Sequence, residues 1–246
     1  MLRPQTLDEV QGQVKVKKQL RISINACKIK GTVYPHSMFC GGKGIGKTTL
    51  AECMANELNV PIEVCNGANL RNVRSLLPYL ARIQHASILF CDEIHKCSPL
   101  VQTYLLTVIE QFRYTIGSQQ DSVTLELPEF TFIGATTSTG LILDPLLNRF
   151  IYKYALENYS IEDLTKIILV NSKKLDLDIG EDCAKIIAGT CRGTGRTSVN
   201  RLQWISDYIT SNSLGRLTPE ETLKALAICG VSADGMEPDD RKYLMK

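Results

Sequence analysis

A short glycine-rich stretch, CGGKGIGKTT at residues 40–49, contains the pattern G-x-x-x-x-G-K-T. The apolar run SMFC leads into it, and a pattern of helical periodicity, TTLAECMANEL, follows. Glycine allows the backbone to wrap phosphate oxygens with N–H groups, and a helix starting after the loop adds the positive end of its dipole. The stretch therefore predicts a phosphate-binding loop that joins a strand to a helix. The alternative is a glycine-rich turn that binds no ligand.

Short apolar runs alternate with helical patterns through the first 156 residues. Such runs, nearly all apolar and separated by helices, are typical of a parallel sheet covered on both faces. The sequence therefore predicts a three-layer α/β fold with a five-stranded sheet. The five runs are SMFC, PIEVC, SILFC, FTFIGA and IYKYAL, at residues 37–40, 61–65, 87–91, 130–135 and 151–156.

The strand pattern stops after residue 156, and residues 157–232 are predicted to form a small all-helical domain. One helix is expected to begin after Ser160, which has Asp163 at the third position of a capping box. Another is expected to begin after Thr218, which is followed by a proline at the first helical position. The pattern VNRLQWISDYI predicts a helix between them, with Trp204 in the core of the domain.

The composition favours an ordinary globular protein, because 44% of the 246 residues are hydrophobic, 22% are charged and the net charge is +2. This balance neither requires nor excludes nucleic acid. The nine cysteines include no C-x-x-C pair, so we expect free, buried thiols rather than disulfides or a zinc site. The N-terminus lacks an apolar signal segment, and no apolar run approaches the ~20 residues of a membrane span. We therefore expect a cytoplasmic protein without a membrane partner.

Two adjacent acids, Asp92 and Glu93, follow the apolar run SILFC. In a doubly wound sheet ligands collect at the carboxyl ends of the strands, which places both acids beside the predicted phosphate loop. There, Lys47 would reach the β- and γ-phosphates, the Thr48 hydroxyl would ligate Mg²⁺, and Asp92 would hold that ion through water. Glu93 would orient an attacking water, which indicates hydrolysis rather than transfer to another substrate. An exposed strand end could also simply tolerate two acids.

Six motifs, in this order along the chain, resemble the RuvB family of AAA+ ATPases, almost from end to end. The resemblance implies a P-loop AAA+ domain over residues 1–156 and a helical lid domain over residues 157–232. It also implies an Mg²⁺-dependent ATPase that assembles into a hexameric ring threaded by duplex DNA. Such a ring would drive branch migration of Holliday junctions with the junction-binding partner RuvA. The motifs are LRPQTLDEVQGQ, GGKGIGKTTLA, ILFCDEIH, FTFIGATT, LLNRF and RGTGR.

The resemblance implies roles for single residues. Thr137 matches a sensor of the γ-phosphate, Arg149 matches an arginine finger that enters a neighbouring subunit's site, and Arg196 matches a second sensor on the lid. Taken alone, Thr137 could be a strand-end hydroxyl that caps a turn, and either arginine could be a solvated surface residue. Tyr159 and residues 2–4 match the adenine pocket, although both could equally be linker packing.

The complete expectation for the site has three parts. The catalytic residues are Lys47, Asp92, Glu93, Thr137, Arg149 and Arg196. The metal ligands are Thr48 and Asp92. The residues that bind ATP are Leu2, Arg3, Val10, Gln11, Gly41, Gly44, Ile45, Gly46, Lys47, Thr48, Thr49, Tyr159 and Arg196.

Two departures from the family pattern concern the partners. Residues 233–246 form a tail where the family continues into a winged-helix domain, and we expect that domain to be absent, which weakens binding of duplex DNA. The family hairpin that grips RuvA falls at about residues 113–127, where it is shorter and has the polar tip GSQQDS. That polar tip puts RuvA binding in doubt and leaves a plain surface hairpin as the alternative.

Two further departures concern the nucleotide. Val10 and Gln11 replace an aromatic–aliphatic pair, so adenine stacking is expected to be weaker or rearranged. Gly42 and Lys43 replace two prolines; Gly42 loosens the loop, because proline restricts the unfolded chain and glycine does not. Lys43 adds a positive charge near the phosphates, and we expect it to point to solvent.

Two functions follow from these patterns. The first is an ATPase motor that acts on Holliday junctions or branched DNA in recombination and repair. The second is a binding module that uses ATP to assemble on another AAA+ ring or on a replication factor, without moving DNA itself. A clamp-loader-like ATPase shares the fold but is disfavoured, because such subunits carry a different arginine motif and a further collar domain. The basic face of the helix predicted at residues 14–29 is more simply solvated surface than a nucleic-acid contact.

Overall fold

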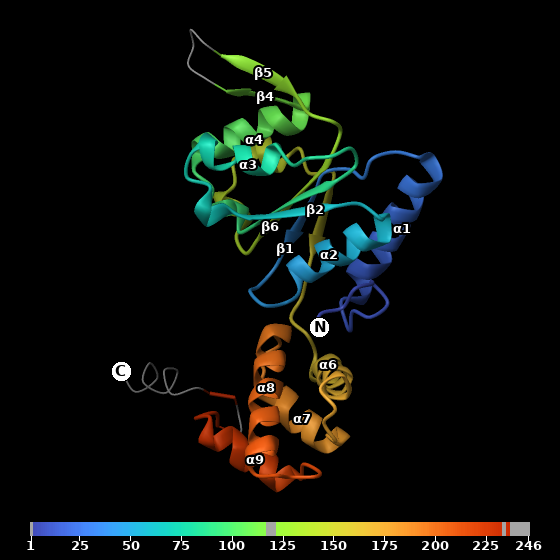
Figure 1. Cartoon of the computed structure of the whole chain (residues 1–246), viewed down its shortest axis with the longest axis vertical. Coiled ribbons are helices and arrows are strands. Elements are labelled where there is room, and N and C mark those ends of the chain that lie inside the picture. The colour runs from blue at the N-terminus through green and yellow to red at the C-terminus, as the bar shows by residue number, and fades with distance from the viewer. Residues whose placement is uncertain (1, 117–121, 233–234, 237–246) are drawn as a thin grey trace.

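The computed structural model describes residues 2–116, 122–232 and 235–236 of the chain. An α/β domain forms one end of the molecule and a cluster of helices forms the other (Figure 1). The chain passes from the first to the second after the last strand of the sheet, and the phosphate loop lies on the side of the α/β domain that faces the helices. The arrangement leaves the predicted nucleotide site between the two parts.

Parallel strands form the central sheet, in the order β2-β3-β6-β1-β7. The strand that leads into the phosphate loop, β1, lies between β6 and β7, and every neighbouring pair in this sheet is parallel. Each strand begins and ends within one residue of its apolar run, which confirms the predicted sheet. The strands are β1 Ser37–Cys40, β2 Ile62–Asn66, β3 Ile88–Asp92, β6 Thr131–Thr136 and β7 Tyr152–Ala155.

Side chains alternate between the two faces of the sheet and form two cores, one on each face. Phe39 and Phe90 pack with α1 and α2, whereas Met38 and Leu89 pack with α3 and α4 on the other face. All four side chains are buried, so the three-layer sandwich predicted from the sequence is confirmed. The helices of this domain are α1 Val14–Lys30, α2 Lys47–Leu58, α3 Leu77–Leu80, α4 Pro99–Gln111 and the short α5 Asp144–Leu147.

An antiparallel pair of strands projects from the end of the α/β domain opposite the helical cluster (Figure 1). It lies where the sequence predicts a hairpin and consists of β4 Arg113–Ile116 and β5 Val123–Glu126. The predicted polar tip falls on residues 117–122, of which residues 117–121 lie outside the described residues. The two arms carry exposed apolar side chains that the sequence analysis did not single out, namely Ile116, Val123 and Leu125.

The helical end of the chain surrounds a core of its own, against which Trp204 packs. The Trp204 indole donates a hydrogen bond to the Ala225 carbonyl at 2.7 Å, so its polar edge is satisfied. At Ser160 the hydroxyl accepts from the Asp163 N–H, but the reciprocal capping box forms instead at Thr218, with Glu221. The helices are α6 Ile161–Lys174, α7 Glu181–Gly189, α8 Gly195–Ser211 and α9 Pro219–Ile228.

The described part of the chain includes all nine cysteines, and each of them is a free thiol, as expected. Within the same residues there is no helix both long and apolar enough to cross a membrane. The tail predicted at residues 233–246 lies outside the described residues except for Gly235 and Met236. The Gly235 carbonyl accepts a hydrogen bond from the Arg192 guanidinium at 2.8 Å, which ties this short piece to the lid.

Candidate functional site

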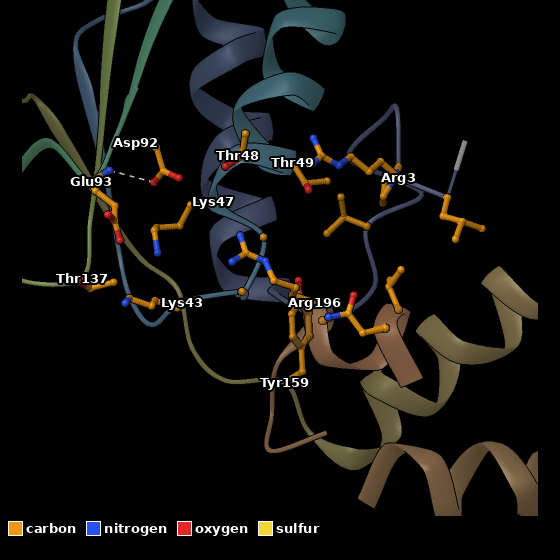
Figure 2. Close-up of a pocket in the computed structure, with 18 of the residues that line it drawn as sticks. Arg3, Lys43, Lys47, Thr48, Thr49, Asp92, Glu93, Thr137, Tyr159 and Arg196 are labelled. Carbon is orange, nitrogen blue, oxygen red and sulfur yellow. Dashed lines mark hydrogen bonds between the residues drawn. The ribbon is translucent and has the colours of Figure 1, made fainter. Parts of the chain in front are cut away.

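A cavity of about 670 Å³ lies between the carboxyl ends of β2, β3 and β6 and the first turn of α8. Figure 2 shows the loop, the two acids and the lid side chains around this one space. Both parts of the molecule and the N-terminal segment contribute to its wall. The lining residues are Leu2, Arg3, Pro4, Val10, Gln11, Lys43, Gly44, Gly46, Lys47, Thr48, Thr49, Asn66, Asp92, Glu93, Lys96, Thr137, Tyr159, Gly195, Arg196, Val199 and Asn200.

The phosphate loop leaves the sheet at Gly41, whose N–H donates to the Thr136 carbonyl at 3.0 Å. The φ of Gly41 is +147°, and a Cβ at this position would lie 2.6 Å from the Leu156 carbonyl oxygen. Gly46 ends the loop at φ +100°, and α2 begins at the next residue. A side chain at either position would be strained, so both glycines are needed for the loop to turn back over the start of α2.

Lys47 is the first residue of α2 and is buried, with 8% of its surface exposed. Its ammonium donates to the carbonyls of Gly41 at 2.9 Å and Gly42 at 2.6 Å. Burial lowers the pKa of Lys47, while the carboxylates of Asp92 and Glu93 act in the opposite direction. The two carbonyls thus direct the Lys47 side chain into the loop, where polyphosphate oxygens could replace them.

The two acids lie where β3 ends. Asp92 is the register partner of Asn66 on β2, and the Asp92 carboxylate accepts a hydrogen bond from the Glu93 N–H at 3.0 Å. Glu93 has a positive φ of +50° and forms an ion pair with Lys96, one turn further on. The hydrogen bond from Lys96 lowers the pKa of the Glu93 carboxyl, and burial opposes that shift only in part. Glu93 is therefore an ionised carboxylate that faces the cavity.

Thr137 follows β6 directly and lines the cavity beside the loop residue Lys43 (Figure 2). Its neighbour Thr136 is fully buried and acts differently, because its hydroxyl accepts from the Ser138 N–H at 2.9 Å and caps the strand end. Lys43 is exposed, as expected, yet its side chain lines the cavity and points toward Thr137 (Figure 2). The loop therefore presents two lysines to the cavity.

The lid closes the opposite side of the cavity through a few contacts with the loop. The Arg196 N–H, in the first turn of α8, donates to the Gly44 carbonyl at 3.1 Å. The Tyr159 N–H donates to the Gly193 carbonyl at 2.8 Å, and the Tyr159 hydroxyl lies beside Gly46. Burial raises the pKa of Tyr159 to about 12, so its hydroxyl stays neutral in the wall of the cavity.

The structure brings most of the predicted residues together in this one cavity. Gly41 and Ile45 belong to the loop but do not line the cavity; Gly41 contributes its carbonyl to Lys47, and Ile45 is buried in the core behind the loop. Arg149 is not in the wall of its own chain's cavity and forms an ion pair with Glu110 on α4. An arginine finger that acts on a neighbouring subunit would likewise lie outside the cavity of its own chain.

Several lining residues were missed by the sequence analysis. Asn66 ends an apolar run at the same sheet edge as Asp92, so the rule that pointed to Asp92 could have found it. Val199 and Asn200 lie one helical turn after Arg196, and their spacing could have placed them on its face. Lys96 follows Glu93 at a distance of three residues, a spacing that the sequence shows but that does not by itself indicate a contact.

The wall of the cavity fits a nucleotide with a divalent cation. The backbone of the loop curves around a space kept open by glycines, and Lys47 supplies a buried cation beside it. The Thr48 hydroxyl and the Asp92 carboxylate line the same cavity, and both are hard oxygen donors of the kind that Mg²⁺ prefers. The parallel sheet, the phosphate loop, the acids at the strand end and the helical lid define a P-loop ATPase of the AAA+ class.

Comparison with known proteins narrows this class. A family model described as the P-loop domain of the Holliday junction DNA helicase RuvB matches residues 2–156, and one described as the RuvB AAA lid domain matches residues 159–232. A solved structure titled Thermotoga maritima RuvB Holliday junction branch migration motor has a TM-score of 0.90 at 34% identity, covering 99% of this chain and 78% of that one.

Curated relatives agree with the family models. Two of them are named Holliday junction branch migration complex subunit RuvB. The protein from Rhodopirellula baltica is 38% identical over 99% of this chain and 68% of its own length. The protein from Kosmotoga olearia is 36% identical over 99% of this chain and 72% of its own length. The chain belongs to the RuvB family.

Proposed function

We propose that this chain is an Mg²⁺-dependent ATPase of a ring-forming motor that acts on Holliday junctions or other branched DNA. The observation that supports the proposal most is the convergence on one cavity of a buried loop lysine, an ionised strand-end glutamate and a lid arginine. Family membership supplies the choice of ATP and of branched DNA, because the relatives are named as subunits of a branch migration complex.

Binding of ATP is assigned to the loop and its surroundings. The Lys47 ammonium would exchange its two carbonyl partners for β- and γ-phosphate oxygens, and the loop N–H groups would hold the remaining oxygens. Thr48 would ligate Mg²⁺ directly and Asp92 through water; when bound, the ion supplies positive charge to the phosphates. Val10, Tyr159 and the segment at residues 2–4 would enclose the base, because they line the same cavity.

Hydrolysis is assigned to Glu93, which would orient and polarise the attacking water. Its ion pair with Lys96 keeps the carboxyl ionised, so it is a hydrogen-bond acceptor for water rather than an acid. Thr137 lines the same cavity and would hold the water or a γ-phosphate oxygen. Arg196 would bring the lid onto the phosphates as their charge changes.

Assembly into a ring, taken to be a hexamer, is supported by Arg149. This arginine is half-exposed, lies outside its own chain's cavity and would enter that of a neighbouring subunit. The partners we propose are duplex or branched DNA and a RuvA-like protein, with the apolar arms of the β4–β5 hairpin as the surface for the latter. The proposed setting is the cytoplasm, where such DNA would be encountered.

Replacement of the proposed water-orienting residue tests the activity. Glu93→Gln is expected to lower turnover of ATP by roughly 10²–10⁴-fold while ATP binding persists, because the amide cannot polarise water as a carboxylate does. Turnover is measured with and without circular duplex DNA at low and high salt, and ATP binding by calorimetry. Glu129→Gln, an exposed change outside the cavity, is the matched control. An unchanged rate in Glu93→Gln contradicts the proposed mechanism.

A further inference from the structure

The Arg149 side chain is held by an ion pair within its own chain. One terminal nitrogen of its guanidinium forms an ion pair with Glu110 Oε1 in the last turn of α4, with 55% of the arginine side chain and 26% of the glutamate side chain exposed. The two residues are 39 positions apart in the sequence and come from different elements. We propose that Glu110 is a positioning residue that orients Arg149 for its entry into the neighbouring subunit's ATP site. This inference rests on the proposed role of Arg149 in that site.

The backbone at Arg149 is already fixed by its neighbours. Leu146 is buried, and its carbonyl accepts the Arg149 N–H at 3.1 Å. Phe150 is also buried, and its ring packs against Phe132 with 5.8 Å between the centroids. Because these contacts hold the backbone on both sides of Arg149, only its long side chain can change rotamer.

The last turn of α4, which carries Glu110, is also held in place. The carbonyl of its neighbour Ile109 is bonded to His36 Nε2 at 3.1 Å, and the His36 carbonyl accepts the Ile151 N–H at 3.0 Å. His36 therefore links the last turn of α4 to the segment that carries Arg149. The half-buried His36 thus connects the two segments that carry the ion pair.

The ion pair with Glu110 reduces the number of rotamers that the Arg149 side chain samples before it enters the neighbouring subunit's site. An arginine side chain loses rotamer entropy when it is held in one orientation. A guanidinium has five N–H donors, so a carboxylate on one nitrogen leaves others to reach phosphate oxygens. Glu110 would hold the arginine in one orientation without occupying all of its donors.

The experiment uses mixed subunits, because a finger that acts in trans separates the two functions of each chain. Arg149→Ala provides an intact ATP site without a finger, and Glu93→Gln provides a finger without hydrolysis. An equal mixture is expected to hydrolyse ATP faster than either variant alone. Glu110→Gln is then added to one component at a time, with Glu129→Gln as the matched control and with unfolding midpoints measured for every variant.

Glu110→Gln in the finger-providing component is expected to lower the rate of the mixture roughly two- to fivefold, which is the range for loss of an exposed ion pair. The KM for ATP should not change, because Glu110 does not line the cavity. The same substitution in the site-providing component, where there is no arginine to orient, should leave the mixture's rate as it was. Glu110→Asp in the finger-providing component should recover part of the loss.

Two failures can be told apart. A mixture that is no faster than its components would contradict the trans role of Arg149, and the inference about Glu110 would then also fail. A mixture that recovers activity but is insensitive to Glu110→Gln, or equally sensitive to it in either component, would overturn the inference alone.

Discussion

Glu93 occupies a strained position that its surroundings hold in place. Its φ of +50° is uncommon for a residue with a side chain. Gly67 lies directly beneath it, and a Cβ on Gly67 would come within 2.3 Å of the Glu93 carbonyl oxygen. The turn after β3 therefore depends on a glycine from a neighbouring segment, and it directs the Glu93 carboxylate toward the cavity and toward Lys96.

Removal of Lys96 should change the pH dependence of hydrolysis. In Lys96→Ala the pKa of the Glu93 carboxyl is expected to rise toward its ordinary value, since the hydrogen bond from Lys96 is the largest cause of its lowering. The carboxylate would then be protonated at a higher pH as the solution is acidified. We expect the acid limb of kcat/KM for ATP to move to higher pH, measured against Lys166→Ala on the lid surface. A limb that stays in place would contradict the assignment of Glu93.

At the scale of elements, His36 joins three segments that are distant in the sequence. Its Nδ1 accepts the Phe132 N–H of β6 at 2.9 Å, so its proton lies on Nε2, which donates to the Ile109 carbonyl of α4. The ring lies tilted against those of Phe112 and Phe130, and burial lowers the pKa of His36. The packing requires the neutral ring, because a proton on Nδ1 would remove the acceptor for Phe132.

The free energy of unfolding should therefore fall in mild acid. His36 has a lower pKa in the folded protein than in the unfolded chain, whose histidine has a pKa of about 6.5. Below that pH the unfolded chain binds more protons, so stability is lost as the pH falls from about 6.5 through the folded pKa, and it is fully present above. Urea unfolding at both ends of this window should show a smaller loss in His36→Asn than in the wild type. His85→Asn, an exposed position, should keep the wild-type loss.

The elements that could be predicted from the sequence are those whose signal is local. The strands were predicted because each is a short apolar run, and the phosphate loop because its glycines and lysine are contiguous. The ion pair of Arg149 with Glu110 could not be predicted, since it depends on how α4 and the segment after α5 are placed in space. The direction of Lys43 depends in the same way on the loop's final turn, and the exposed arms of the hairpin became visible only once β4 and β5 were paired.

At the scale of the whole molecule, the two parts meet at the nucleotide cavity. Gly44 is one of the points of contact, because its carbonyl accepts the Arg196 N–H. A Cβ on Gly44 would lie 3.0 Å from the Arg196 Cβ, and the φ of +74° would itself be strained for any other residue. Lid position and loop conformation are thus linked at the place where the phosphates would lie.

Gly44→Ala should separate the lid from the loop and weaken ATP binding. A backbone strain of about 1–3 kcal/mol that falls on the nucleotide-bound form corresponds to an affinity loss of roughly five- to 150-fold. Calorimetry with a slowly hydrolysed ATP analogue gives the affinity, and hydrogen exchange in the first turn of α8 reports the lid. Gly140→Ala is the matched control, since a Cβ there would meet nothing within 4 Å. Equal affinities for the two variants would show that the lid and the loop are independent.

The position of β1 between β6 and β7 also determines when the ATP site can form. β1 ends at Cys40, but both of its partner strands come more than 90 residues later, at Thr131–Thr136 and Tyr152–Ala155. Pairing over such sequence separations is slow, because the chain loses the entropy of closing a long loop before any contact between the strands stabilises the pair. During synthesis the phosphate loop therefore leaves the ribosome before the two strands that border β1, and we expect it to become ordered, and to bind nucleotide, only after β7 has emerged.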